Sequence, residues 1–84
     1  MGLLSTDKKS KIESLKADIE RQKKAIESIK GNMARAKVSL ANARKNKSST
    51  QGWINNIEGY KKQIEFRKQL IALRRKEIAQ LKTK

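Results

Sequence analysis

The feature that most constrains the fold is a heptad repeat of apolar residues that runs through both halves of the chain. Counted from Ile12 as position a, the a positions of the first half are Ile12, Ile19, Ile26, Met33 and Leu40, and the d positions are Leu15, Gln22, Ile29, Ala36 and Ala43. Counted from Ile57, the a positions of the second half are Ile57, Ile64, Ile71 and Ile78. Apolar residues at this spacing form the seam along which helices pack into a coiled coil. The repeat therefore predicts an all-α protein.

One polar segment interrupts the repeat and predicts the turn. The segment 47–52 reads Lys-Ser-Ser-Thr-Gln-Gly, which combines capping residues with a glycine. We expect a flexible leader at 1–6, followed by a single domain at 7–84 with a helix over about 7–46, a turn at 47–52 and a helix over about 53–82. So short a turn between long helices favours an antiparallel coiled-coil hairpin. A chain of this size rarely builds a stable core alone, so we expect the hairpin to oligomerise or to pack on a partner.

Local signals refine this hairpin. Ser10 and Glu13 have the spacing of a capping box, although Ser5 or Thr6 is also a candidate cap of the first helix. Ser49 or Thr50 is the expected cap of the second helix. The heptad keeps its phase across Gly31, which favours a continuous first helix with room for a kink there.

The position of the turn also predicts a register. If the chain folds back between Ser49 and Thr50, residues whose numbers sum to about 100 face each other. Ile57 then faces Ala43, Tyr60 faces Leu40, Ile64 faces Ala36 and Ile71 faces Ile29. In this register, large residues near the turn lie opposite alanines, which permits a close approach of the helices.

The e positions of the heptad are basic in both halves. They are Lys16, Lys23, Lys30, Lys37 and Arg44, and then Lys61, Lys68, Arg75 and Lys82. In an antiparallel pair the e positions of the two helices lie along the same edge, so this edge collects like charges. The chain holds 22 lysines and arginines against 8 acidic residues, a net charge of +14. Such an excess is typical of proteins that bind a polyanion.

We expect the basic edge to continue into the turn, where Lys45 and Lys47 join the e positions and no acidic residue occurs between Glu27 and Glu58. The predicted polyanion-binding residues are therefore Lys16, Lys23, Lys30, Lys37, Arg44, Lys45, Lys47, Lys61, Lys68, Arg75 and Lys82. Nucleic acid is the favoured polyanion. One basic residue per heptad, about every 10 Å, suits contacts to the phosphate backbone, and the sequence has no base-reading motif. A nucleoprotein or the interior of a virion fits such a structural protein.

Two other partners remain open. An inhibitor or adaptor that docks its basic edge on an acidic protein surface would show the same pattern. An anionic membrane is the third choice, because residues 1–6, Met-Gly-Leu-Leu-Ser-Thr, fit the N-myristoylation pattern and lysines follow them. The expected response to salt separates the first two, since phosphate contacts give a steep loss of affinity and a specific protein interface gives a shallower one.

A second apolar stripe lies outside the seam of the second helix. Phe66 and Leu73 occupy c positions and Leu70 occupies a g position, so the three share one face. Arg67 and Arg74 occupy d positions beside them, and a buried arginine needs a partner. We expect Phe66, Arg67, Leu70, Leu73 and Arg74 to form an interface for a partner or for self-association. The alternative is irregular packing inside a monomer, in which the arginine stems lie along apolar surface.

Composition argues against several classes of protein. The chain has no histidine and no cysteine, and its acidic residues stand at outward positions. We expect neither an enzyme nor a metal or cofactor site. No apolar run reaches the roughly 18–20 residues of a membrane-spanning helix. We expect a protein of the cytoplasm, the nucleoid or the inside of a virion, neither secreted nor transmembrane.

Overall fold

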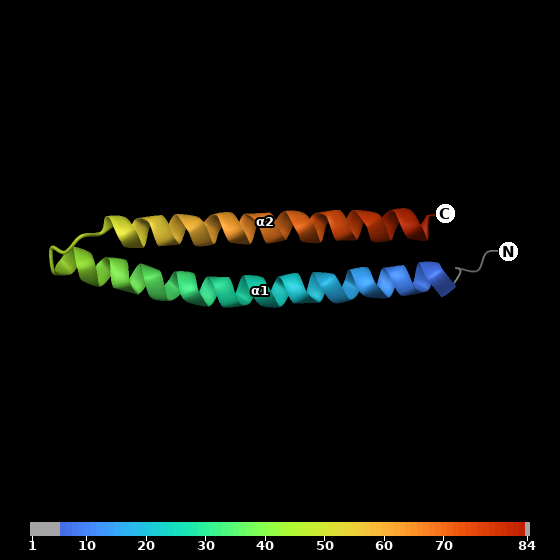
Figure 1. The fold of residues 1–84 in the computed structure, drawn as a ribbon, viewed down its shortest axis with the longest axis horizontal. Coiled ribbons are helices and arrows are strands. Elements are labelled where there is room, and N and C mark those ends of the chain that lie inside the picture. The colour runs from blue at the N-terminus through green and yellow to red at the C-terminus, as the bar shows by residue number, and fades with distance from the viewer. Residues whose placement is uncertain (1–5, 84) are drawn as a thin grey trace.

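The computed structural model describes residues 6–83 and shows a hairpin of two long antiparallel helices (Figure 1). Helix α1 spans Thr6–Lys45 and helix α2 spans Gln51–Lys82. The molecule is a rod with principal extents of 69, 15 and 11 Å. The first residue of α1 and the last residue of α2 lie at the same end, opposite the turn (Figure 1). The predicted all-α hairpin is confirmed.

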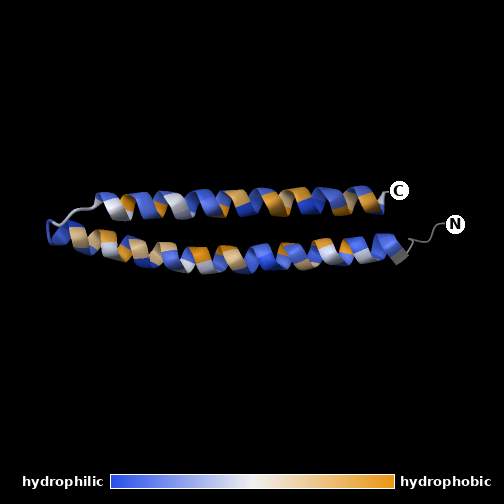
Figure 2. Cartoon of the chain, viewed as in Figure 1, coloured by the Kyte–Doolittle hydropathy of each residue, from blue (hydrophilic) through white to orange (hydrophobic). Residues whose placement is uncertain are grey.

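The seam between the helices is built from the a and d positions. The buried residues of the described chain are Ile12, Ile19, Ile26, Ile29, Ala36, Ala43, Ile57, Ile64 and Ile71, each 5–8% exposed. Five of them, Ile19, Ile26, Ile29, Ile64 and Ile71, form one cluster, with Met33, Tyr60 and Ile78 packed against it. Figure 2 shows hydrophobic segments recurring along each helix among hydrophilic ones. The packing of these apolar faces, rather than the helix propensity of the individual residues, therefore stabilises the two helices.

Lys47 ends α1 in a left-handed conformation. Its φ is 57°, its N–H donates to the carbonyl of Arg44 at 3.2 Å, and the N–H of Ser48 donates to the carbonyl of Ala43 at 2.8 Å. This pair of bonds is a Schellman motif, which satisfies carbonyls at the end of the helix. Glycine usually occupies the left-handed position because a β-carbon is strained there. The chain carries lysine instead.

The turn is shorter than predicted and begins earlier. It covers residues 46–50, so Gln51 and Gly52 belong to α2 rather than to the turn. Thr50 occupies the N-cap position as predicted, but its side chain makes no capping hydrogen bond.

The capping box predicted at Ser10 and Glu13 is wrong, because α1 already begins at Thr6 and Ser10 lies inside it. Residues 1–5 of the predicted leader and myristoylation pattern, Ser5 among them, lie outside the described residues, and Thr6 is the first helical residue rather than part of a leader. The predicted continuity through Gly31 is confirmed, since α1 runs unbroken from 6 to 45. A β-carbon built on Gly31 meets nothing within 4 Å, so no close packing requires glycine there.

The predicted register is wrong by about one heptad. Arg74 bonds to Asp18 and Arg67 bonds to Gln22, so paired numbers sum to 92 and 89 rather than to about 100. A sum near 93 matches every a position with a d position of the other helix. Ile57 then lies opposite Ala36 rather than Ala43, Tyr60 opposite Met33 rather than Leu40, Ile64 opposite Ile29 rather than Ala36, and Ile71 opposite Gln22 rather than Ile29.

Two physical features select this register. The arginines at d positions find acceptors on α1, which an unpaired arginine in a seam requires. In addition, α1 extends past the first turn of α2, and the connecting residues run back alongside it (Figure 1). The prediction assumed a symmetric turn. Because α1 extends past the start of α2, this overhang of α1 lowers the sum of paired residue numbers below the symmetric value of about 100.

Candidate functional site

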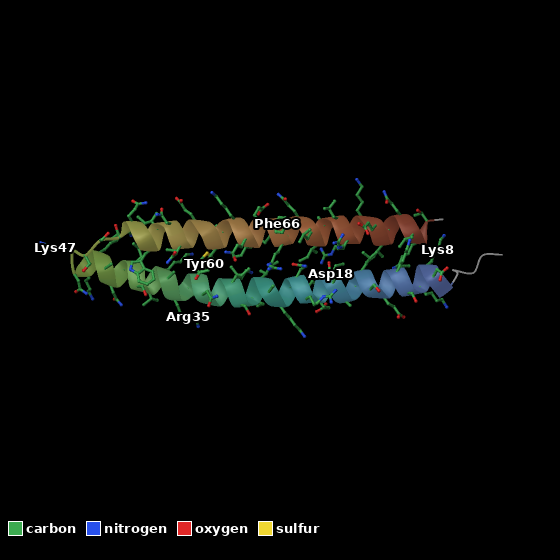
Figure 3. All side chains as sticks on the ribbon, in the orientation of Figure 1. Lys8, Asp18, Arg35, Lys47, Tyr60 and Phe66 are labelled. Atoms are coloured by element: carbon green, nitrogen blue, oxygen red, sulfur yellow. The ribbon has the colours of Figure 1, made fainter. Side chains whose placement is uncertain are left out.

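The basic edge is open to solvent along its whole length. All nine e positions named above are exposed, and so are Lys45 and Lys47. Figure 3 shows Lys47 at the turn end of the rod. None of these side chains takes part in the seam, because position e lies at its border and the a and d residues fill its interior. The positive charges are therefore free to meet a ligand without unfolding the hairpin.

Four of the predicted residues come together in one shallow groove between the helices. Lys23 and Lys30 from α1 and Lys68 and Arg75 from α2 line it, with Ile26 and Ile71 of the seam as its apolar floor. Lys24 and Glu27 complete the lining. Five basic side chains and one acidic side chain thus surround this groove, a net charge of +4. Residues 38 to 52 positions apart in the chain converge here because the helices are antiparallel and both place lysine or arginine at e.

Little within the chain neutralises this edge. Glutamates at b positions precede e-position bases by three residues and are candidates for ion pairs on the same helix. Of these, Glu20 and Lys23 lie within reach, with 3.8 Å between Oε1 and Nζ. No other e-position base has an ion pair within 4.0 Å in the described chain. Exposed pairs of this kind contribute little, so the edge stays strongly positive.

The remaining predicted residues extend the edge on both sides of the groove. Lys16 and Lys82 lie toward the open end of the hairpin, and Lys37 and Lys61 lie toward the turn. Arg44, Lys45 and Lys47 surround the end of α1. The positive charge therefore follows the long axis of the rod.

The opposite edge is held by polar contacts that the heptad pattern did not reveal. Arg74 Nε donates to Asp18 Oδ2 at 2.9 Å, and Arg67 Nη1 donates to Gln22 Oε1 at 2.7 Å. Asp18 lies on the side of α1 that faces α2 (Figure 3). It also accepts bonds from Arg21 and Gln22 on its own helix. In the sequence, the signs of these contacts were the acid Asp18 at a g position and the amide Gln22 at a d position. Which arginine each of them meets could be identified only once the register of the helices was known.

The Asp18 carboxylate is stabilised in its charged form. The hydrogen bond from Arg74 is the main reason that the pKa of Asp18 lies below its usual value, and partial burial opposes this shift. The same bond raises the pKa of Arg74, which is charged in any case. This contact therefore joins the helices as a charge-assisted pair.

The predicted partner interface divides into two groups. Arg67 and Arg74 are engaged with α1, as described above. Phe66 and Leu73 are 59% and 53% exposed, and Leu70 is half-buried. The apolar stripe predicted outside the seam is therefore present on α2, while the arginines beside it serve the hairpin.

A second hollow lies at the open end of the rod. Lys8, Lys11 and Leu15 of α1 and Glu77 and Leu81 of α2 contribute to its walls. Its charges are mixed, and the hydroxyl residues Ser10, Ser14 and Thr83 also line it. Within residues 6–83 no cluster of three or more possible metal ligands occurs. None of the helices described has the length and apolar character needed to cross a bilayer.

Comparison with known proteins found no matching family model, no matching curated protein and no matching solved structure.

Proposed function

We propose that the protein holds a polyanion, nucleic acid in the first place, along its basic edge and without reading its base sequence. The observation that carries this proposal is the groove in which Lys23, Lys30, Lys68 and Arg75 converge from both helices. Converging like charges repel one another in the free protein, and a chain of phosphates removes that repulsion. Binding then gains the counterions released from each neutralised phosphate.

The form of the edge explains why base sequence has no role in this proposal. The basic side chains are exposed and follow a straight rod, so they reach a backbone but do not enter a groove as a recognition helix does. The edge also lacks an aromatic residue at the e positions on which an unpaired base would stack. Contacts of lysine and arginine with phosphates supply affinity and position the protein, but they do not discriminate between bases.

The test is fluorescence anisotropy with two unrelated DNA duplexes and one RNA across a series of salt concentrations. We expect similar affinities for the two duplexes and a steep linear loss of log affinity with log salt. Replacing all four groove residues, Lys23, Lys30, Lys68 and Arg75, with glutamine removes up to four phosphate contacts. The slope on duplex DNA should then fall by about 3 to 4, since each contact contributes about 0.9.

A matched variant separates the edge from net charge alone. It replaces four exposed basic residues away from the e positions, Lys11, Arg35, Lys62 and Lys76, with glutamine. Both variants lose four charges, but only the groove variant should show this fall of about 3 to 4 in the salt slope. Equal loss in the two would refute a role for this edge. Weak binding by the unmodified protein even at low salt would refute the nucleic-acid proposal and direct the search to an acidic protein partner.

A further inference from the structure

Phe66 and Leu73 of the apolar stripe of α2 are uncovered in the hairpin, and Leu70 between them is half-buried. Phe66, Leu70 and Leu73 are spaced by four and three residues, so they lie on one face of the helix. They occupy c and g positions, whereas α1 covers the a and d positions. Figure 3 labels Phe66 on α2. Two large hydrophobic side chains more than half exposed and a third beside them indicate an interface.

The hairpin also lacks a complete interior. No described side chain is less than 2% exposed, and the most deeply buried residue, Ala36, retains 5%. Two helices cover each other on one side only, so every seam residue stays close to solvent. A second layer packed on the stripe would complete a helical bundle, which is the usual way in which helices of this kind bury both faces.

The residues around the stripe are arranged almost symmetrically about Leu70. Phe66 and Leu73 flank it by four and three residues, and Gln63 and Glu77 flank it by seven on each side. If two copies of α2 pack antiparallel with a two-fold axis at Leu70, Phe66 of each copy meets Leu73 of the other. Gln63 of each copy then lies near Glu77 of the other, where an amide N–H can donate to a carboxylate oxygen. A two-fold interface requires this kind of self-complementarity.

The distribution of charge around the stripe is compatible with a second copy as the partner. A second copy also carries +14, so it is accepted only where positive charge is absent. From residue 56 to residue 80, the c and g positions of α2 hold no lysine or arginine. The nearby Arg67 and Arg74 are drawn toward α1 by Gln22 and Asp18. In an antiparallel α2 pair the two basic edges also stay apart, because the e positions lie on the opposite side of each hairpin from the c and g positions.

From these observations we infer that the protein forms a two-fold symmetric dimer of hairpins through Phe66, Leu70 and Leu73 of α2. The inference is independent of the proposed function, because it concerns the edge opposite the basic groove. Sedimentation velocity and light scattering from micromolar to several hundred micromolar protein should give twice the chain mass of 9.6 kDa.

Substitution of the stripe tests the surface. Phe66→Gln with Leu73→Gln should raise the dimer dissociation constant by more than about a hundredfold, because each substitution occurs twice in a symmetric interface. Val38→Gln is the matched control, since Val38 is 62% exposed on α1 and lies outside the stripe. The control should remain a dimer, and circular dichroism should show unchanged helicity in both variants. A wild-type mass of 9.6 kDa throughout, or a dimer that survives the double substitution, would overturn the inference.

A cross-link tests the position of the axis without depending on affinity. The chain has no cysteine, so Leu70→Cys introduces a single thiol at the proposed axis. Mild oxidation should join two Leu70→Cys chains at low protein concentration, while Val38→Cys chains should stay separate under the same conditions. Equal cross-linking of both variants, or none at residue 70, would show that the copies do not meet there.

Discussion

The polar pair Gln22 and Arg67 offers the sharpest test of how the seam is stabilised. Both residues occupy d positions and are half-buried, and Arg67 Nη1 donates to Gln22 Oε1 at 2.7 Å. Methionine at either position keeps an unbranched stem and removes the polar atoms. We predict that Gln22→Met and Arg67→Met each lower the free energy of unfolding, and that the double variant recovers most of the loss.

The magnitudes follow from the bond and from the burial of the two sites. A hydrogen bond to a charged group contributes about 1.5–3 kcal/mol to stability. Each single substitution loses this bond and gains about 1 kcal/mol, because a half-buried apolar side chain gains roughly half the value of full burial. The net cost of each is therefore about 0.5–2 kcal/mol. The double variant loses the bond once and gains apolar burial twice, so it should lie within about 1 kcal/mol of the wild type.

Urea unfolding followed by circular dichroism measures these differences, at one fixed protein concentration because self-association would change the apparent stability. The two singles and the double form a double-mutant cycle, with an expected coupling of about 1.5–3 kcal/mol. Gln69→Met makes the same chemical change at an exposed site of α2 and should alter stability by less than about 0.5 kcal/mol. If the two seam substitutions are additive within about 0.5 kcal/mol, the bond does not stabilise the hairpin and the reasoning fails.

Three further predictions concern the register, the turn and the acid range. With cysteines at Ala36 and Ile57, a short thiol-specific linker should join the two helices of one chain. Cysteines at Ala43 and Ile57 should not be joined, because Ala43 lies about 10 Å further along α1 than Ala36. The opposite result would support the symmetric register. Lys47→Gly should raise the free energy of unfolding by about 1 kcal/mol in urea titrations, because glycine adopts φ of 57° without strain, and a loss of stability would contradict the strained cap. Since the pKa of Asp18 is lowered in the folded chain, its charged form stabilises the fold above the ordinary aspartate pKa of about 3.9, and this stabilisation is lost as pH falls through the lowered pKa. The difference in the free energy of unfolding between wild type and Asp18→Asn should therefore shrink in this acid range. A difference that stays constant would exclude this linkage.

The periodicity of the sequence was enough to predict which residues are buried. Every a position and most d positions of the first helix are apolar, so a single period defines the seam, although polar residues such as Gln22, Arg67 and Arg74 also occupy d positions. The same periodicity cannot distinguish registers that differ by one heptad, because each a position again meets a d position after a shift of seven residues. The register depends on contacts between distant residues, such as Arg74 with Asp18, and on the overhang of α1 at the turn.

The ends of the helices were harder to predict for a local reason. The glycine and capping residues of the turn suggested that it extends to Gly52, but α2 begins at Gln51. Lysine carries no turn preference, so nothing in the sequence marked Lys47 as the left-handed residue. At the candidate site, exposure of the e positions followed from the heptad alone. Their convergence at the groove required the antiparallel arrangement, in which Lys30 and Lys68 line the same surface.

The two long edges of the rod differ in how their charges are balanced within the chain. On one edge, Asp18 and Glu77 both meet Arg74, so the folded chain supplies its own counter-charges. On the other edge, Lys23 and its neighbours in the groove repel one another, and folding brings them closer than they are in the unfolded chain. Salt weakens this repulsion, and a polyanion removes it while adding attraction. The edge that destabilises the free hairpin is therefore the edge at which a polyanion would stabilise it most, and part of the binding free energy would come from relief of that repulsion.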